Sequence, residues 1–80
     1  MEFRLYCIWD TAAKMGSKVF EATNDLIAWR VFEQANKGND YAHESQLLWL
    51  GSIDKTTNKI TPVEPTQIKP TDLELEETQT

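Results

Sequence analysis

The sequence predicts an α+β fold with the element order ββαββ, in which four mainly antiparallel strands form one sheet and a single helix lies across one face. Two observations support this prediction. Residues 3–10 alternate with the period of two that is typical of strands, and residues 46–50 form the most apolar predicted strand of the chain. Between residues 25 and 37 apolar side chains recur every three or four positions, which is typical of a helix with one buried stripe.

The first predicted strand, residues 3–10, is apolar on both sides. The side that we expect to face the core carries Phe3, Leu5, Cys7 and Trp9, and the opposite side carries Arg4, Tyr6 and Ile8. Gly16 lies in the stretch that should turn the chain. Residues 18–22 then form a second, short strand.

The helix should begin after Asn24 and end before Gly38. The side-chain oxygen of Asn24 can accept a free backbone N–H of the first turn, and Asp25 suits the positive end of the helix. Gly38 is the natural left-handed residue after the last turn. The apolar stripe that we expect to be buried consists of Ile27, Ala28, Val31, Phe32 and Ala35.

The last two strands are predicted at residues 46–54 and 60–63. Gly51 marks a bulge in the first of them, and Asn58 tolerates the left-handed backbone of the turn that follows. Pro62 fits only a strand at the edge of a sheet, because it has no backbone N–H to donate.

The composition changes after Val63, which predicts a single α+β domain at residues 1–63. That part carries a net charge of −1 and all eight aromatic residues, whereas residues 64–80 carry −4 and no aromatic residue. Such a segment buries too little apolar surface to offset its conformational entropy, so we expect an acidic, mobile C-terminal tail. The alternation in residues 72–76 leaves open a docked strand, with Leu73 and Leu75 facing inward.

One helix covers only one face of a sheet, yet both long strands are apolar on two sides. Leu26 and Trp29 also fall outside the main stripe of the helix. We therefore expect a homodimer in which Leu26, Trp29 and Trp49 meet a second copy of the chain, because twofold dimers are the commonest oligomers.

The sequence predicts no catalytic residues, no metal site and no cofactor. His43 lies in a polar stretch beside Glu44, and a metal site needs three or four ligands. Cys7 alternates with apolar neighbours and has no nearby base, as a nucleophile would require. Asp10 and Asp54 each end a predicted strand and are best interpreted as turn residues. We therefore do not expect an enzyme.

Several classes of location are disfavoured by composition. The chain is 40% hydrophobic but contains no run of about 20 apolar residues, so we expect no membrane span. The first residues lack the basic-then-apolar order of a secretory signal. A single cysteine cannot form an intrachain disulfide, which fits a reducing cytoplasm.

Binding of single-stranded DNA is a candidate function. The candidate contact residues are four bases and one aromatic ring that could stack on a nucleotide: Arg4, Lys18, Lys55, Lys59 and Tyr6. The charge of the chain argues against it, because thirteen acidic and eight basic residues give a net charge of −5 and most DNA-binding domains are basic.

Three segments resemble the small nonstructural protein of gokushovirus-like microviruses, which are bacteriophages with circular single-stranded DNA genomes. They are LYCIWD at residues 5–10, FEATND at 20–25 followed by Ala28, Arg30 and Phe32, and LLWLGSID at 47–54. The resemblance extends from residue 3 to about residue 63. Asn58 stands where the family usually has a turn glycine, and the acidic tail lies outside the pattern.

The resemblance implies a non-enzymatic phage accessory protein in the cytoplasm of the bacterial host. It implies a role in replication or packaging of the single-stranded DNA genome, by binding that DNA. The alternative is a protein–protein adaptor that binds the phage replication protein, a capsid precursor or a host factor without contacting DNA. The resemblance favours the first hypothesis, and the net charge favours the second.

Overall fold

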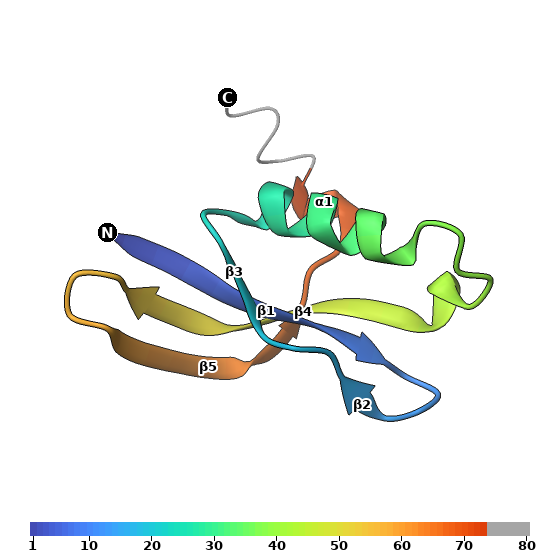
Figure 1. The fold of residues 1–80 in the computed structure, drawn as a ribbon, viewed down its shortest axis with the longest axis horizontal. Helices are drawn as coiled ribbons and strands as arrows, with labels where there is room; N and C mark the ends of the chain where they lie inside the picture. Colours follow the sequence, from blue (N-terminus) through green and yellow to red (C-terminus); the bar gives the residue numbers. More distant parts are fainter. Residues whose placement is uncertain (74–80) are drawn as a thin grey trace.

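The computed structural model of the chain describes residues 1–73. The elements in order are β1 (Glu2–Asp10), β2 (Met15–Gly16), β3 (Phe20–Ala22), α1 (Asp25–Asn36), a short 3₁₀-helix η1 (Ala42–Glu44), β4 (Ser45–Asp54) and β5 (Lys59–Gln67) (Figure 1). The predicted α+β class and the order ββαββ are confirmed. β3 corresponds to the second predicted strand, and β2 is an additional two-residue strand in the stretch that was expected only to turn the chain.

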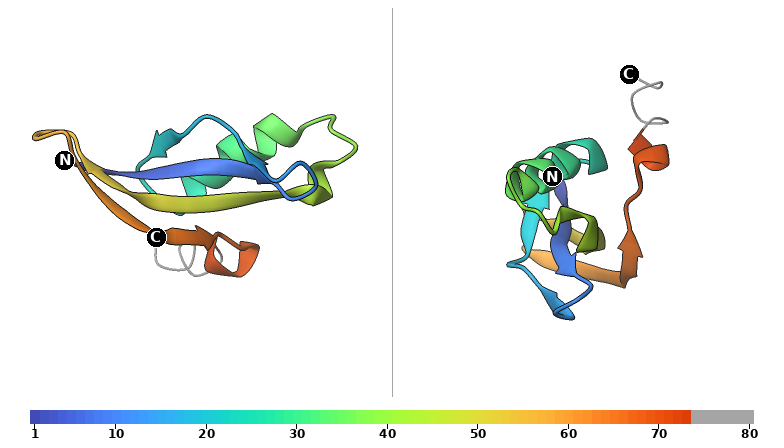
Figure 2. Two further views of the ribbon diagram at one scale, coloured as in Figure 1. Left: turned by 90° about the horizontal axis from the view of Figure 1, so that it is seen from below. Right: turned by 90° about the vertical axis from the view of Figure 1, so that its right-hand side faces the viewer.

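All strand pairs are antiparallel and form one curled sheet (Figure 2). β1 and β4 pair along their whole lengths, and β5 pairs with the far side of β4. β2 and β3 both pair with the other side of β1, near its end and its beginning respectively. The order across the sheet is therefore β2 and β3, then β1, β4 and β5.

The start of α1 follows the sequence prediction. The Oδ1 of Asn24 accepts a hydrogen bond of 2.9 Å from the backbone N–H of Ile27, and Asp25 occupies the first turn. The helix lies above the sheet, and the segment after β5 runs up behind it (Figures 1 and 2). The core therefore lies between the sheet, α1 and the segment that follows β5.

The face of the sheet that α1 covers is the opposite of the predicted one. Tyr6 is 0% exposed and belongs to the same cluster as Ala28 and Phe32 of the helix, with Ile8 packed against it. The expectation that Phe3, Leu5, Cys7 and Trp9 face the helix is therefore wrong. Because both sides of β1 are apolar, the alternation itself did not identify the covered side.

The buried cluster contains residues of β1, β3, α1, β4 and the segment that follows β5. Its members are Tyr6, Ala22, Ala28, Phe32, Leu47, Ile68 and Leu73, and the partly buried residues packed against it are Ile8, Phe20, Leu26, Trp29 and Trp49. Two of the seven buried members come from the segment that was expected to be a mobile tail.

The predicted boundary after Val63 is wrong for residues 64–73. β5 continues to Gln67, and the next residue, Ile68, donates its backbone N–H to the carbonyl oxygen of Leu47 at 2.9 Å. Ile68 is 5% exposed and Leu73 is 6% exposed. Leu73 faces inward as the docked alternative expected, but it does so from a helical turn and not from a strand. Leu75 and the rest of residues 74–80 lie outside the described residues.

Gly51 produces the predicted bulge. The register of β4 against both neighbours shifts beside it, and its φ of +149° is a backbone conformation that other residues rarely adopt. A Cβ atom at Gly51 would overlap the carbonyl oxygen of Thr61 and lie 3.0 Å from the Cα of Pro62. This glycine therefore allows β5 to approach β4 closely.

Gly51→Ala is expected to lower the free energy of unfolding by about 2–3 kcal/mol, because it combines an unfavourable φ with a backbone clash. Urea denaturation followed by circular dichroism measures the change. Gly16→Ala is the matched control, since its Cβ would meet Cys7 Sγ at an ordinary 3.6 Å. Equal free energies of unfolding for the two variants would contradict this account of the bulge.

Candidate protein-interaction site

The groups considered for catalysis lie apart from one another. Asp10 and Asp54 lie at opposite ends of the β1–β4 pair, where Asp10 is opposite Ser45 and Asp54 is opposite Glu2. Each carboxylate accepts backbone N–H groups of the turn that follows it, as the turn interpretation predicts. The hydrogen bond from Thr56 holds the pKa of the Asp54 carboxyl below its usual value.

The other two candidates have ordinary environments. The Nε2 of His43 lies 3.8 Å from Glu44 Oε1, and the His43 side chain is 74% exposed. Cys7 is buried, and desolvation raises the pKa of its thiol, which disfavours the reactive thiolate. Within residues 1–73, no three His, Cys, Asp or Glu side chains are grouped so that they could hold a metal ion. None of the helices in this part of the chain is both long and apolar enough to cross a membrane.

The prediction that Tyr6 offers an exposed ring to DNA is wrong. Its ring stacks on Phe20 with centroids 5.8 Å apart, and its hydroxyl donates a 2.6 Å hydrogen bond to Asp25 Oδ1. Arg4 lies on the same side of β1. Its guanidinium is 4.1 Å from the centre of a Trp49 ring, and its Nε is 3.4 Å from Asp25 Oδ1, an ion pair without hydrogen-bond geometry. These residues join β1 to the start of α1.

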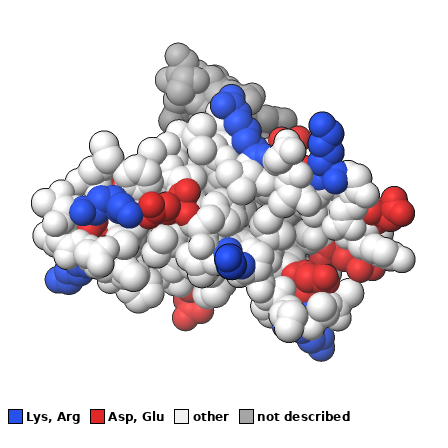
Figure 3. Space-filling view, viewed as in Figure 1, with Lys and Arg blue, Asp and Glu red and all other residues white. Residues whose placement is uncertain are grey.

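The remaining predicted DNA contacts are not brought together with Arg4. The Nζ of Lys55 lies 3.0 Å from the carboxylate of Glu21, and Lys59 is opposite Asp54 at the start of β5. Lys18 lies between β2 and β3, at the other edge of the sheet. Figure 3 shows Lys and Arg side chains separated from one another, with acidic groups among them.

The residues predicted for the dimer interface are half-buried by the chain itself. Leu26, Trp29 and Trp49 pack against the cluster that includes Ile68 and Leu73. The segment after β5 therefore covers part of the apolar surplus that was assigned to a second copy.

The other flank of α1 is open. Ile27 is 38% exposed, Val31 is 42% exposed, and Ala35 is exposed one turn further on. We call these three residues the open flank. With Arg30 and Gln34 they line an open groove of about 620 Å³. The expectation that the whole stripe is buried is wrong for these three positions, because only the Ala28 and Phe32 side of the stripe rests on the core.

The open flank lies beside a free edge of the sheet. A hollow of about 310 Å³ is lined by Ala35 and Asn36 of α1 together with residues of β1, β2 and the adjoining turns, including Met15 and Ser17. Residues 15–22, which we call the edge segment, pair with β1 on one side only among the described residues. Figure 1 shows β3 and α1 in front, and the right panel of Figure 2 shows the segment after β5 on the opposite side of the helix.

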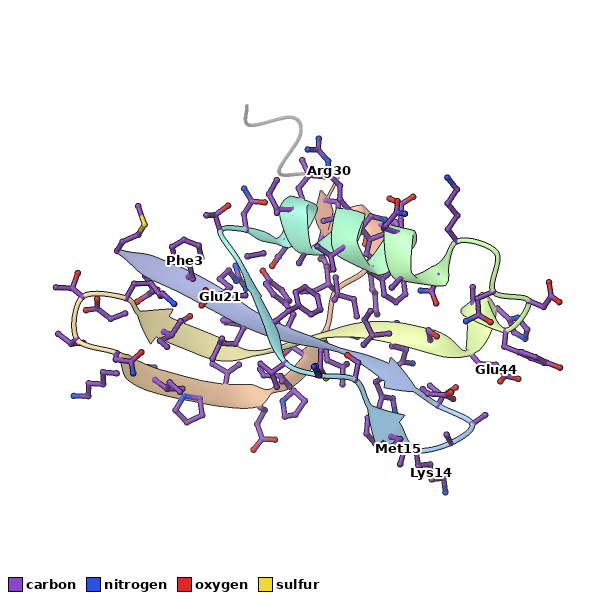
Figure 4. All side chains as sticks on the ribbon, in the orientation of Figure 1. Phe3, Lys14, Met15, Glu21, Arg30 and Glu44 are labelled. Atoms are coloured by element: carbon purple, nitrogen blue, oxygen red, sulfur yellow. The ribbon has the colours of Figure 1, made fainter. Side chains whose placement is uncertain are left out.

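The open flank and the edge segment form one surface, which we call the open side. Met15 and Val19 of the edge segment are 67% and 58% exposed. In Figure 4, Lys14 projects from the β1–β2 turn and Met15 from β2, while Arg30 projects from α1 away from the sheet. The open side thus combines exposed apolar side chains of α1 with those of the edge segment, and the hollow that Ala35 and Met15 both line joins the two.

The sequence indicated that the helix has an exposed apolar surface, but it did not show which residues form that surface. The helix has more apolar positions than one sheet face needs, namely the five of the stripe together with Leu26 and Trp29. No family model, curated protein or solved structure matches the chain.

Proposed function

We propose that this chain is a non-enzymatic accessory protein that acts by binding another protein through its open side. The observation that carries the proposal is the exposure of Ile27 and Val31 on the open flank, whose third member, Ala35, shares a hollow with the edge segment. Four of the seven exposed large hydrophobic side chains among the described residues lie on this side: Met15, Val19, Ile27 and Val31. Clusters of exposed apolar side chains are typical of interaction sites in proteins.

The resemblance of the sequence to a microvirus nonstructural protein supports the biological setting of the proposal. In that setting the partner is the phage replication protein, a capsid precursor or a host factor, and the chain serves as an adaptor in replication or packaging. The net charge of −5 supports a protein partner over a nucleic acid.

Binding of single-stranded DNA is the second candidate, on a different surface. The side of β1 that α1 does not cover carries the half-buried rings of Phe3 and Trp9. The Nζ of Lys55 lies 5.9 Å from the centre of the Phe3 ring. Aromatic rings beside a cation are the means by which many proteins stack single strands. Lys55 is already paired with Glu21, and Figure 4 places Glu21 near Phe3, so the local charge is largely neutralised.

Val31→Asp is expected to weaken binding to the partner protein at least tenfold, because it places an unpaired charge in an apolar contact. Biolayer interferometry with the immobilised full chain measures binding of purified microvirus replication protein, of capsid precursor and of a single-stranded oligonucleotide. Ile60→Asp is the matched control, since Ile60 is 56% exposed but lies on β5.

The oligonucleotide separates the two candidate functions. If it alone binds, with an affinity that falls steeply with salt and is unchanged by Val31→Asp, the DNA function replaces the adaptor function. If a phage protein binds equally well to the Val31→Asp and Ile60→Asp variants, the open side is not the site.

A further inference from the structure

We infer that the partner docks on the open side as an extended strand, which adds to the edge segment and carries acidic residues alternating with apolar ones. This inference rests on the proposed function and specifies the chemistry of the partner. It is drawn from the position of the helix over the sheet, from the edge of β3 that pairs with no strand among the described residues, and from the charge of Lys18 in the edge segment.

In the direction across the strands, the sheet of the described residues ends at β3, whereas α1 extends beyond it. α1 contacts β3, β1 and β4, and its buried residues Ala28 and Phe32 lie over this part of the sheet. A helix is about 10 Å wide with its side chains, whereas neighbouring strands are about 4.8 Å apart. The open flank therefore extends past β3, where no strand lies among the described residues. One added strand would fill this position and cover Ile27 and Val31.

The edge segment is held in place to receive such a strand. β3 pairs with β1 through Phe20, Glu21 and Ala22. Ser17 is also fixed to β1, since its N–H donates to the carbonyl oxygen of Ile8 at 2.8 Å and its Oγ accepts the Ile8 N–H at 2.9 Å. The outer edge of a paired strand presents unused backbone N–H and C=O groups, which an extended peptide can bind.

Alternation along the added strand determines its composition. Side chains on the helix side would touch the open flank and the ring of Phe20, so they should be apolar, while the others point away from the helix. Lys18, which lies in the edge segment itself, takes part in none of the ion pairs found within residues 1–73. A base without an ion-pair partner among these residues is complementary to a carboxylate on the added strand.

A second copy of this chain fits the open side less well. Twofold contact through the edge segments would bring the Lys18 side chains of both copies together, and like charges at an interface oppose association. We therefore assign the open side to a separate, acidic strand.

The test uses the full chain and a labelled eight-residue peptide in which Val alternates with Glu. The same peptide with Lys in place of Glu tests charge, and a version with N-methylated backbone tests strand pairing. Fluorescence anisotropy at low salt measures affinity, and amide chemical shifts of the isotopically labelled chain locate the site. The acidic peptide is expected to bind at least tenfold more tightly than either comparison peptide, with shifts concentrated in residues 15–22 and α1.

Two variants complete the test. Lys18→Glu is expected to reduce the preference for the acidic over the basic peptide at least tenfold, and Val31→Asp to weaken binding of the acidic peptide by a similar factor. Ile60→Asp should change neither. Because these residues are exposed, we expect all three variants to fold. Circular dichroism checks that each of them is folded.

Three results would overturn the inference: equal affinity for acidic and basic peptides, binding unaffected by N-methylation, or a dimer of the chain that Val31→Asp dissociates. The proposed function fails separately, when no protein binds the open side. If a phage or host protein binds there and Val31→Asp abolishes that binding, while the acidic peptide does not bind, the function stands and the strand-addition mode is rejected.

Discussion

Shortening the chain after Gln67 is expected to lower the free energy of unfolding by about 3–6 kcal/mol, because it removes two buried side chains worth about 1.5–3 kcal/mol each. Those side chains are Ile68 and Leu73, which are 5% and 6% exposed. Domains of this size are stabilised by only about 5–15 kcal/mol in total. The shortened chain should therefore be partly or wholly unfolded at 37 °C.

A chain that ends at Leu73 is the matched control, because it keeps both buried residues. The difference in free energy of unfolding between the two shortened chains, from urea denaturation, measures the contribution of residues 68–73. Ile68→Ala and Leu73→Ala in the full chain divide that contribution between the two side chains. If the chains ending at Gln67 and Leu73 unfold at the same urea concentration, the segment after β5 is not part of the core.

Asp25→Ala is expected to lower the free energy of unfolding by about 3–4 kcal/mol. Asp25 is 8% exposed and its Oδ1 serves two partners, the hydroxyl of Tyr6 at 2.6 Å and the Nε of Arg4 at 3.4 Å. Its removal leaves a fully buried hydroxyl without this acceptor and a partly buried guanidinium without its acid. The figure lies near the lower end of the range for buried ion pairs, because the Arg4 side chain is 30% exposed to solvent.

Comparison variants identify the source of this loss. Tyr6→Phe removes one hydrogen bond and should cost about 1–2 kcal/mol. Arg4→Met combined with Asp25→Ala should recover part of the loss, since it removes the unpaired charge. Asp40→Ala, at an exposed position after the helix, should change stability by less than about 0.5 kcal/mol. An Asp25→Ala variant as stable as Asp40→Ala would show that the polar cluster does not join β1 to α1.

Local features of the sequence determined most of the elements. The period of two predicted β1, and a short apolar run predicted β4. Asn24 with Asp25 predicted the start of α1, because capping depends on residues within one turn. Asn58 has the left-handed backbone expected of a turn, with a φ of +63°. Gly51 lies at the expected bulge. Each of these predictions depends on neighbours in the chain.

The composition of the C-terminal segment was a poorer guide. Its acidic residues and prolines are typical of a mobile tail, and residues 64–73 nevertheless complete β5 and the core. The average composition of the segment did not show that two of its apolar side chains, Ile68 and Leu73, are buried. Burial depends on individual side chains and not on the average polarity of a segment. Proline is tolerated in β5 because this strand lies at the edge of the sheet, as expected for Pro62.

The sequence by itself determined the two long strands β1 and β4, the helix, and the apolar stripe that contains the open flank. Only the tertiary structure decided which side of each apolar element is covered. β1 is apolar on both sides, and α1 covers the side that carries Tyr6. The hydroxyl of Tyr6 donates a hydrogen bond to Asp25, which lies 19 residues further along the chain. Among the described residues the sheet ends at β3 on this side of α1, and Ala28 and Phe32 are buried while Ile27 and Val31 remain exposed. Periodicity shows which residues share a side, but what covers that side depends on contacts between segments far apart in the chain.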